Sequence, residues 1–483
     1  MISKLIYHSN KNRAFRQNNF QFKQTMKILL FCLLLKFNIS LAQEMASDFF
    51  AYRYNQIIFE SNQFAWEKNT SFGPLRYNDF DFMIKNKISE DSLKLNRAIG
   101  LNVDFHDYNL YAFQRISFKS KFYTYFYFRL VNDDNYHSRY TGISRKKSRL
   151  GLSSGEMDFA GMGYEDDNFL LQFGRGRQSW GVGGDIKIGL SEYSPPYDYG
   201  LLGLKFGNYK FRFFNGFLEN IDSYNRYITG RGLEWNNNKN ILVSFSEIVI
   251  YSGLNRSLDF AYLNPVSTHL EIELNNRQNT LGVTSGNAVW QFSLDYKFHR
   301  DLRIMTNFII DEFVLDKIQL DSNKTNGLAF SNKIVWNPPY IPKNSNIFFS
   351  FISTGTKTFR HEIGYNNFVQ RGYPLGWVYG SDGYEIASGF NLFLDEKFLC
   401  ISKVGKRIIG SNSTKTLPYL QNDDYLIGIY PSNPVKDIFF IDLKFDLLLK
   451  HNLHLHTHVE YLHNIIEDPE IKLNFGLNIS VNK

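Results

Sequence analysis

Alternation of apolar and polar residues with a period of two is the feature that most restricts how this 483-residue chain can fold. In the segment from Asn287 to Phe298, every second residue from Ala288 onward is apolar, and the residues between are mostly polar. Successive side chains of a β-strand point to opposite faces, so this segment predicts a strand with one apolar face. After Ala42 no apolar run approaches the roughly 20 residues of a membrane-spanning helix. If the chain crosses a membrane, it must therefore do so as a closed β-barrel.

The same alternation recurs from Phe118 to Leu130, from Phe439 to Leu449 and from Ile471 to Val481. The composition, with 45 Phe and 30 Tyr but 12 Pro, suits strands that are buried on one face. A soluble β-sandwich also alternates, but its strands are usually shorter and its apolar faces pack on each other. We therefore predict an all-β fold, a closed antiparallel transmembrane β-barrel with aromatic girdles at both membrane surfaces.

The N-terminal region has the layout of a secretory signal peptide. Lys27 precedes an apolar core from Ile28 to Leu35, and Ser40-Leu41-Ala42 supplies small residues at a cleavage site. We expect residues 1–42 to be a cleaved leader, with Met26 as the true start. The alternative, a membrane anchor, would need about 20 apolar residues.

The remaining chain divides into two expected parts. Residues 43–100 alternate less cleanly and are expected to form a periplasmic or lead-in segment that includes the first strands, and residues 101–483 are expected to form the barrel. The leader holds seven basic residues and no acidic one, so its removal leaves 47 basic against 47 acidic residues. Nucleic-acid binding needs a clustered basic surface, and no nucleic-acid partner is expected. Cys400 would be the only cysteine left, so no internal disulfide is expected.

Four motifs follow one another along the central part of the chain. The first contains Gly174-Arg175, Trp180-Gly181-Val182-Gly183 and Ser194-Pro195-Pro196 before Asp198; the second contains Asn264-Pro265 ahead of an expected strand at Asn275 to Asn279; the others are Asp311 to Phe313 and Arg371 to Gly383. In this order they resemble the Wzi capsule-assembly family over roughly residues 165–395. The resemblance implies a monomeric barrel of about eighteen strands that helps attach capsular polysaccharide to the cell.

The segment from Arg175 to Asp198 is the candidate glycan-binding region. Sugar rings lie on aromatic faces, and their hydroxyls pair with cationic and acidic side chains. The candidates are Arg175, Arg177, Trp180, Tyr193, Tyr197 and Asp198. We give equal weight to a structural role for each, such as Trp180 in the aromatic girdle or Arg175 at a turn. The structural positions of the motifs are Gly174, Gly181, Gly183, Pro195, Pro196, Asn264 and Pro265. Gly181 and Gly183 are expected to allow positive φ where the chain turns sharply, and Pro195-Pro196 to stiffen the next segment.

Neither a metal centre nor a catalytic motif stands out. His454, His456 and His458 share one strand face, but neighbours on that face lie roughly 6 to 7 Å apart, too far for three to bind one ion unaided. A polar face toward a wet lumen is the favoured interpretation. The chain lacks Gly-x-Ser-x-Gly and His-Glu-x-x-His, so we predict no cofactor and no enzymatic activity.

Besides polysaccharide attachment, two functions remain open: a channel for small solutes, and a gliding or adhesion accessory role. A porin would have an open lumen lined by charge, whereas the resemblance implies a lumen plugged by loops and inward side chains. Bulky residues expected to face inward at Tyr123, Tyr125 and Tyr127 favour the plugged lumen. The expected location is the outer membrane, and the expected partners are surface polysaccharide and outer-membrane lipid.

Overall fold

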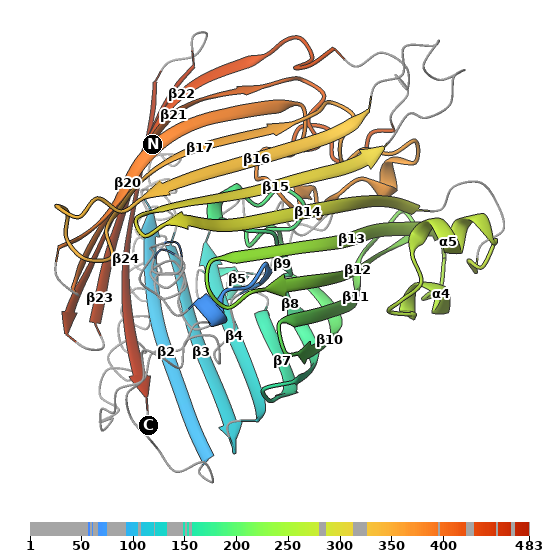
Figure 1. Cartoon of the computed structure of the whole chain (residues 1–483), viewed down its shortest axis with the longest axis horizontal. Coiled ribbons are helices and arrows are strands. Elements are labelled where there is room, and N and C mark those ends of the chain that lie inside the picture. The colour runs from blue at the N-terminus through green and yellow to red at the C-terminus, as the bar shows by residue number, and fades with distance from the viewer. Residues whose placement is uncertain are drawn as a thin grey trace, which may run out of the picture.

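Eighteen long antiparallel strands of the described chain close into one barrel (Figure 1). The structure is a computed structural model that describes residues 57, 60, 66–74, 93–104, 108–119, 121–132, 148–149, 152–153, 157–279, 286–312, 326–394, 397–421, 429–450, 453–464 and 469–482. The last strand closes on the first, with Asn482 opposite Asn96 and Asn474 opposite Asp104. The predicted all-β barrel is confirmed. The expected leader lies outside the described residues.

The barrel strands, in the order in which they pair around the wall, are β2 (Leu93–Asp104), β3 (Tyr108–Phe118), β4 (Phe122–Asn132), β7 (Met157–Glu165), β8 (Phe169–Gly176), β10 (Tyr197–Phe206), β11 (Tyr209–Ile221), β12 (Tyr224–Asn236), β13 (Ile241–Leu254), β14 (Gly286–His299), β15 (Leu302–Glu312), β16 (Gly327–Trp336), β17 (Asn346–Thr354), β20 (Gly383–Leu394), β21 (Phe398–Ile409), β22 (Lys436–Lys450), β23 (Leu453–Asn464) and β24 (Glu470–Asn482). The short elements are η1 (Trp66–Lys68), β1 (Phe72–Gly73), β5 (Ser148–Arg149), β6 (Leu152–Ser153), β9 (Ser179–Trp180), η3 (Gly184–Ile186), α4 (Phe260–Leu263), α5 (His269–Leu274), η4 (Gly364–Asn366), β18 (Val369–Gln370) and β19 (Tyr373–Pro374).

The alternation of β14 divides its side chains between the outside and the inside of the barrel as predicted. Trp290, Phe292 and Leu294 are exposed on the outer face, while Gln291 and Asp295 are buried on the inner one. Water cannot satisfy backbone groups inside a bilayer, so a closed wall with an apolar outer face is the β-structure that can span it. The protein is therefore an outer-membrane barrel.

The segment from Phe118 to Leu130 was predicted to be one strand, but in the structure it contains the end of β3 and most of β4. Phe118 ends β3, a turn at Lys119 with φ 54° reverses the chain, and Phe122 begins β4. The apolar alternation continues across this turn and hides it. Within β4 the predicted faces hold, because Phe126 is exposed outside and Tyr127 is buried inside.

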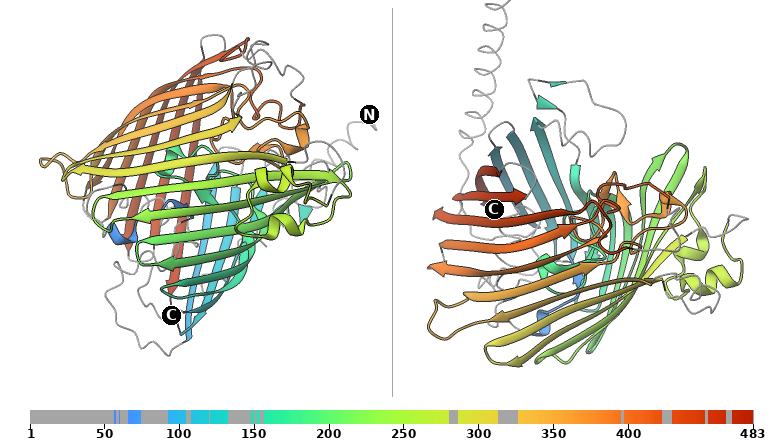
Figure 2. Two further views of the ribbon diagram at one scale, coloured as in Figure 1. Left: turned by 45° about the vertical axis from the view of Figure 1, so that its right-hand side comes forward. Right: turned by 90° about the horizontal axis from the view of Figure 1, so that it is seen from above.

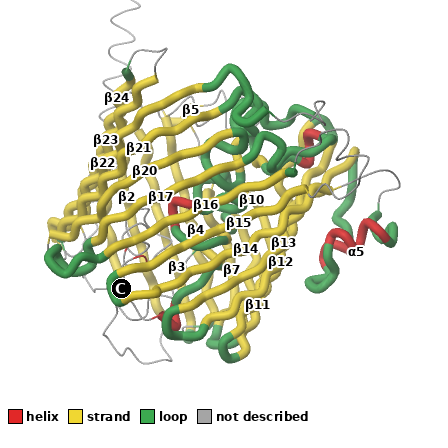
Figure 3. The backbone as a smooth tube through the Cα atoms, turned by 45° about the horizontal axis from the view of Figure 1, so that its top comes forward, coloured by secondary structure: helices red, strands yellow, loops and turns green. Residues whose placement is uncertain are grey.

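The two ends of the barrel differ in the length of their connections. At one end, turns such as Gly207-Asn208 and Arg300-Asp301 join neighbouring strands directly. At the other end, residues 177–196, 255–285, 355–382 and 410–435 form long connections; where they are described, Figure 3 shows them mostly as green loops, with short helices in red. Outer-membrane barrels have short periplasmic turns and long extracellular loops, so the long-loop end is extracellular.

The long connections do not all project away from the barrel. Residues 177–196 and 355–382 fold back into the lumen, where β9 pairs with β1 of the N-terminal segment (Figure 2). By contrast, α4 and α5 in the connection 255–285 lie outside the wall. The stretch expected to be a strand, Asn275 to Asn279, is instead the turn after α5, a helix that Thr268 caps and in which His269 and Ile272 face the barrel. No helix of the described segments has the length and apolarity needed to cross a membrane.

Candidate functional site at the extracellular end

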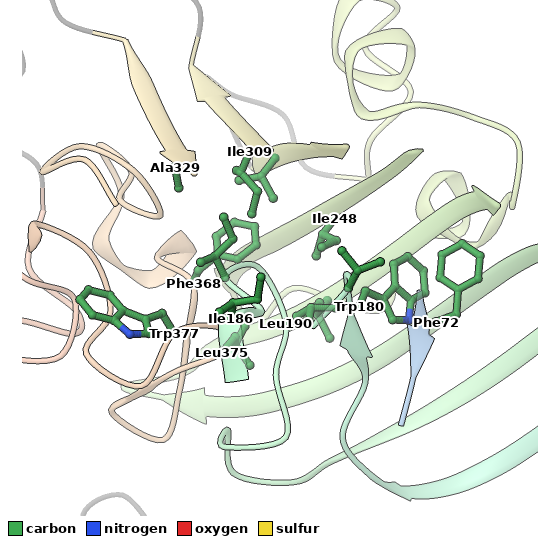
Figure 4. Packing of buried hydrophobic residues seen from close by; sticks show 14 of the residues in the cluster. Phe72, Trp180, Ile186, Leu190, Ile248, Ile309, Ala329, Phe368, Leu375 and Trp377 are labelled. Atoms are coloured by element: carbon green, nitrogen blue, oxygen red, sulfur yellow. The ribbon is translucent and has the colours of Figure 1, made fainter. Parts of the chain in front are cut away.

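A hydrophobic core fills the lumen of the barrel. Trp180 packs edge-on against Phe72 of the N-terminal segment at a ring-centroid distance of 5.0 Å (Figure 4). It also packs edge-on against Phe214 of the wall, at 5.1 Å. Backbone hydrogen bonds fasten the lumenal segments to one another: Gly181 N donates to Ser71 O, and Ser191 N donates to Leu375 O. These segments, residues 66–74, 177–196 and 355–382, are called the plug below. The predicted plugged lumen is present.

Charged groups on the inner wall pair with the plug. Lys333 of β16 donates to Glu60 at 2.6 Å and to Asp185 at 2.7 Å, and Lys403 of β21 contacts Asp185 at 3.2 Å. Asp295 of β14 accepts from Asn69 of the plug at 2.8 Å. A buried charge is tolerated when it is paired and hydrogen-bonded. The inner charges therefore hold the plug in place and do not line an open pore.

The motif glycines and prolines shape the plug. Gly181 and Gly183 have φ of 117° and 69°, the positive values expected of them. Gly174 lies against the backbone of Ala160 on β7, where a Cβ atom would clash. Pro195 and Pro196 are buried where the plug rejoins the wall, and Pro196 O accepts a hydrogen bond from Gln370.

Three of the six candidate glycan contacts are buried in or beside the plug. Trp180 is 0% exposed, and Tyr197 faces the lumen with its ring 5.9 Å from that of Tyr199. Arg177 donates to Ser194 O and lies over the ring of Phe159. Neighbouring side chains cover these three groups, so they pack within or beside the plug, and their contact with a glycan stays a prediction. Trp180 lies in the lumen core and not in the aromatic girdle.

The other three candidates face outward. Tyr193 is 61% exposed, and Arg175 pairs with Asp198 at 2.9 Å between β8 and β10. Arg175 and Asp198 occupy the outward positions of their strands near the extracellular end, so this pair lies on the outer wall. The six candidates are close in the sequence, but in the fold three of them are buried in or beside the plug and the other three face outward. The second motif, Asn264-Pro265, lies between α4 and α5 outside the barrel.

A buried arginine fastens the extracellular part of the plug. Arg226 of β12 donates to Glu219 at 2.6 Å, and also to the carbonyls of Tyr365, Asn367 and Val369 at 2.5, 2.8 and 3.0 Å. An irregularity between Phe217 and Glu219 in β11 lets Glu219 reach this arginine on the inner face, because such bulges re-aim side chains.

Glu219 extends the same network to a second loop. It also accepts from Tyr419 Oη at 2.8 Å and from Arg371 N at 3.0 Å. Gly372 N in turn donates to Tyr419 Oη at 2.7 Å, and burial raises the pKa of the Tyr419 phenol. Arg226 and Glu219 thus join residues 355–382 to residues 410–421. We call these two loops together the cap. Residues 355–382, the extracellular part of the plug, thus belong to both.

Aromatic and cationic side chains lie around the Arg226–Glu219 pair. Tyr365 of the cap stacks on Tyr224 with a centroid distance of 4.4 Å, and Lys415 lies 4.1 Å from the ring centroid of Tyr373. Both tyrosines of the stack and Tyr373 are partly exposed. Tyr193 lies two residues from Ser191, whose backbone N donates to Leu375 O, next to the β18–β19 hairpin that contains Tyr373. Tyr365, Tyr373 and Tyr419 belong to the cap, and with Tyr193 of residues 177–196 and Tyr224 of β12 they are called the cap tyrosines.

The histidine face of β23 points inward, as expected for a polar lumenal face. His454 is buried, and His458 lies 3.1 Å from Asp442 of β22. No group of three or more His, Cys, Asp or Glu residues in the described chain could hold a metal ion. His454 and His456 have partners of their own.

Sequence analysis missed Glu219, Arg226 and the cap tyrosines other than Tyr193. The fourth motif, Arg371 to Gly383, lies largely within the cap and was the available signal. No sequence signal pointed to Glu219, because its inward position depends on a bulge that leaves the apolar pattern of β11 intact.

Comparison with known proteins gives a fold but no sequence family. No protein-family model and no curated protein matches the chain. Among solved structures, Wzi of Escherichia coli, described as an outer-membrane protein involved in group 1 capsule assembly and as a carbohydrate-binding β-barrel, matches with a TM-score of 0.61 at 12% identity, over 91% of this chain and 99% of Wzi. OprD and OccK3 of Pseudomonas aeruginosa match with TM-scores of 0.47 and 0.46 at 9% and 8% identity, over 83% and 81% of this chain and 96% and 95% of theirs. This chain thus shares the barrel fold of Wzi.

Proposed function

We propose that this protein is a non-catalytic, monomeric outer-membrane barrel that holds capsular or other surface polysaccharide at the cell surface. The observation that carries the proposal is the cap, which combines a closed extracellular end with partly exposed tyrosines and Lys415. Carbohydrate rings stack on aromatic faces, and their hydroxyls and carboxylates pair with charged groups. The fold shared with Wzi and the order of the four motifs agree with this role.

The packed lumen argues against the channel alternative. Trp180, Ile186, Ile188 and Leu375 are fully buried where a porin would have water. Charged side chains of the inner wall, such as Lys333, form ion pairs with the lumenal segments, whereas a porin uses such side chains to line its channel.

The contacts that we propose for the polysaccharide are outward-facing. Tyr193, Tyr365 and Tyr373 would stack on sugar rings, and Lys415 would pair with acidic or hydroxyl groups. Arg175 and Asp198, the remaining outward candidates of the first motif, would extend the contact over the outer rim.

The test is polymer retention by cells that lack the protein and carry plasmid-borne variants. Tyr193→Ala with Tyr373→Ala should leave polymer in the medium, while the barrel remains heat-modifiable on gels. The matched control is Tyr340→Ala, because Tyr340 is 73% exposed in the turn 337–345 at the periplasmic end. Equal retention by the double variant and the control would contradict the proposed contacts, and normal retention without the protein would contradict the function.

A further inference from the structure

The helical segment outside the barrel, residues 256–279, carries apolar side chains on its free side. Phe260, Val266 and Leu274 are 83%, 77% and 73% exposed, and Leu270 is about half exposed. The opposite side is buried: Tyr262 stacks on Tyr251 of β13 at a centroid distance of 4.2 Å, and Ile272 belongs to the same cluster. The segment therefore has two apolar sides: one packs on the barrel, and the other is left uncovered.

The height of this segment relative to the membrane follows from β14. Its outward residues from Trp290 to Phe298 are all exposed and apolar or aromatic. Eight residues of strand span roughly 27 Å, or about 20 Å along the membrane normal at a tilt of about 40°, close to the apolar band of such barrels. Trp290 therefore lies at the extracellular edge of the band, in the position of a girdle residue.

Glu247 of β13 fastens α5 at this edge. It accepts from Trp290 Nε1 at 3.1 Å, and both of its carboxylate oxygens accept from His269 N at 3.1 Å. Glu247 also lies 3.4 Å from Arg231 Nε of β12. Both charges occupy outward positions of their strands, where lipid would otherwise meet them, and the helical segment covers them.

We propose that the free side of residues 256–279 inserts into the outer leaflet, at the boundary between lipid headgroups and acyl chains. It lies at the same height as that boundary, it is continuous with the lipid-facing band through Trp290, and it shields a charged pair from lipid. Charged groups at its rim, the Glu271–Arg277 pair at 2.6 Å, would remain among headgroups. Interfacial segments bury an apolar side at the boundary between headgroups and acyl chains, while their charged groups remain among the headgroups.

The test uses the full-length barrel in lipid vesicles with Cys32 and Cys400 changed to serine. Leu274→Cys and Phe260→Cys would carry a fluorophore in separate samples. Nitroxide lipids labelled near the headgroup should quench both, and aqueous iodide should quench both severalfold less than at Leu420→Cys, a control on the exposed cap. Leu294→Cys, in the middle of the band, should instead respond to nitroxides deep in the acyl chains.

Two results would overturn the proposal. Iodide quenching at positions 260 and 274 equal to that at 420 would place the segment in water. Protection from both iodide and nitroxide lipids would mean that protein covers it, either another copy or a partner. Polysaccharide binding by the cap does not enter this measurement, so the outcome is independent of the proposed function.

Discussion

Arg226 should hold the cap closed without holding the barrel together. Arg226→Met removes the ion pair with Glu219 and the hydrogen bonds to three carbonyls of the cap, while it keeps most of the apolar stem. Breaking a buried ion pair by removing one partner costs about 3–5 kcal/mol, because the other charge is left uncompensated. The wall strands keep their backbone ladders, so this cost should fall on the cap.

The expected size of the effect follows from the same cost. About 3–5 kcal/mol corresponds to roughly a hundred- to a few thousand-fold increase in the population of the open cap. Hydrogen exchange of residues 355–382 and 410–421 in detergent or vesicles should show it, with the wall strands unchanged. Single-channel recordings should show brief openings that are absent from the wild type.

A matched control is available on the outer wall. Arg175 pairs with Asp198 between neighbouring strands near the same end, but this pair is solvent-accessible and should be worth about 0–1 kcal/mol. Arg175→Met should therefore leave exchange in the cap unchanged. Equal exchange in Arg226→Met and Arg175→Met would refute the reasoning, and so would unfolding of the whole barrel by Arg226→Met.

Three further predictions follow from packing and charge. Trp180→Ala should destabilise the plug by about 3–5 kcal/mol, measured as faster exchange of residues 177–196, whereas a role for Trp180 only in glycan contact would leave exchange unchanged. Leu294→Arg should lower the free energy of unfolding by about 2–4 kcal/mol in folding titrations, and Tyr340→Arg by near zero; equal costs would contradict the assigned membrane band. Burial, with some repulsion from His361, Arg231 and Arg256, lowers the pKa of His269 to about 4. The unfolded segment then binds more protons, so docking of α5 should weaken as pH falls from about 6.5 to 4, and unchanged proteolysis of residues 256–279 over that range would contradict it.

The sequence predicted the wall better than the loops, for a physical reason. Wall residues such as Leu294 and Asp295 obey a local rule, since the strand's own pleat decides which one meets lipid. The turn at Lys119 was missed because the apolar period ran through it. The helix ending at Leu274 was missed because the resemblance suggested a strand just after it, and the N-cap residue Thr268 was not considered.

The candidate site depended on contacts between segments far apart in the chain. Trp180 is a core residue because Phe72 and Phe214 cover its ring, and no local pattern distinguishes such a tryptophan from an exposed one. Tyr193 was identified by the density of aromatic and charged residues around it and is exposed. In the sequence Arg226 is an ordinary polar residue of an alternating strand. Only the folded cap places four hydrogen-bond acceptors around its guanidinium group.

Direct binding of surface polysaccharide to the purified barrel tests the central claim most directly. Polymer isolated from the producing cells would be titrated onto the protein in nanodiscs, with Tyr193→Ala plus Tyr373→Ala and Tyr340→Ala as paired variants. Each aromatic contact is worth about 0.5–1.5 kcal/mol, so the double variant should bind roughly 5- to 150-fold more weakly, and Tyr340→Ala should bind like the wild type. Absence of binding by the wild-type barrel, or equal affinity in all three proteins, would contradict the account.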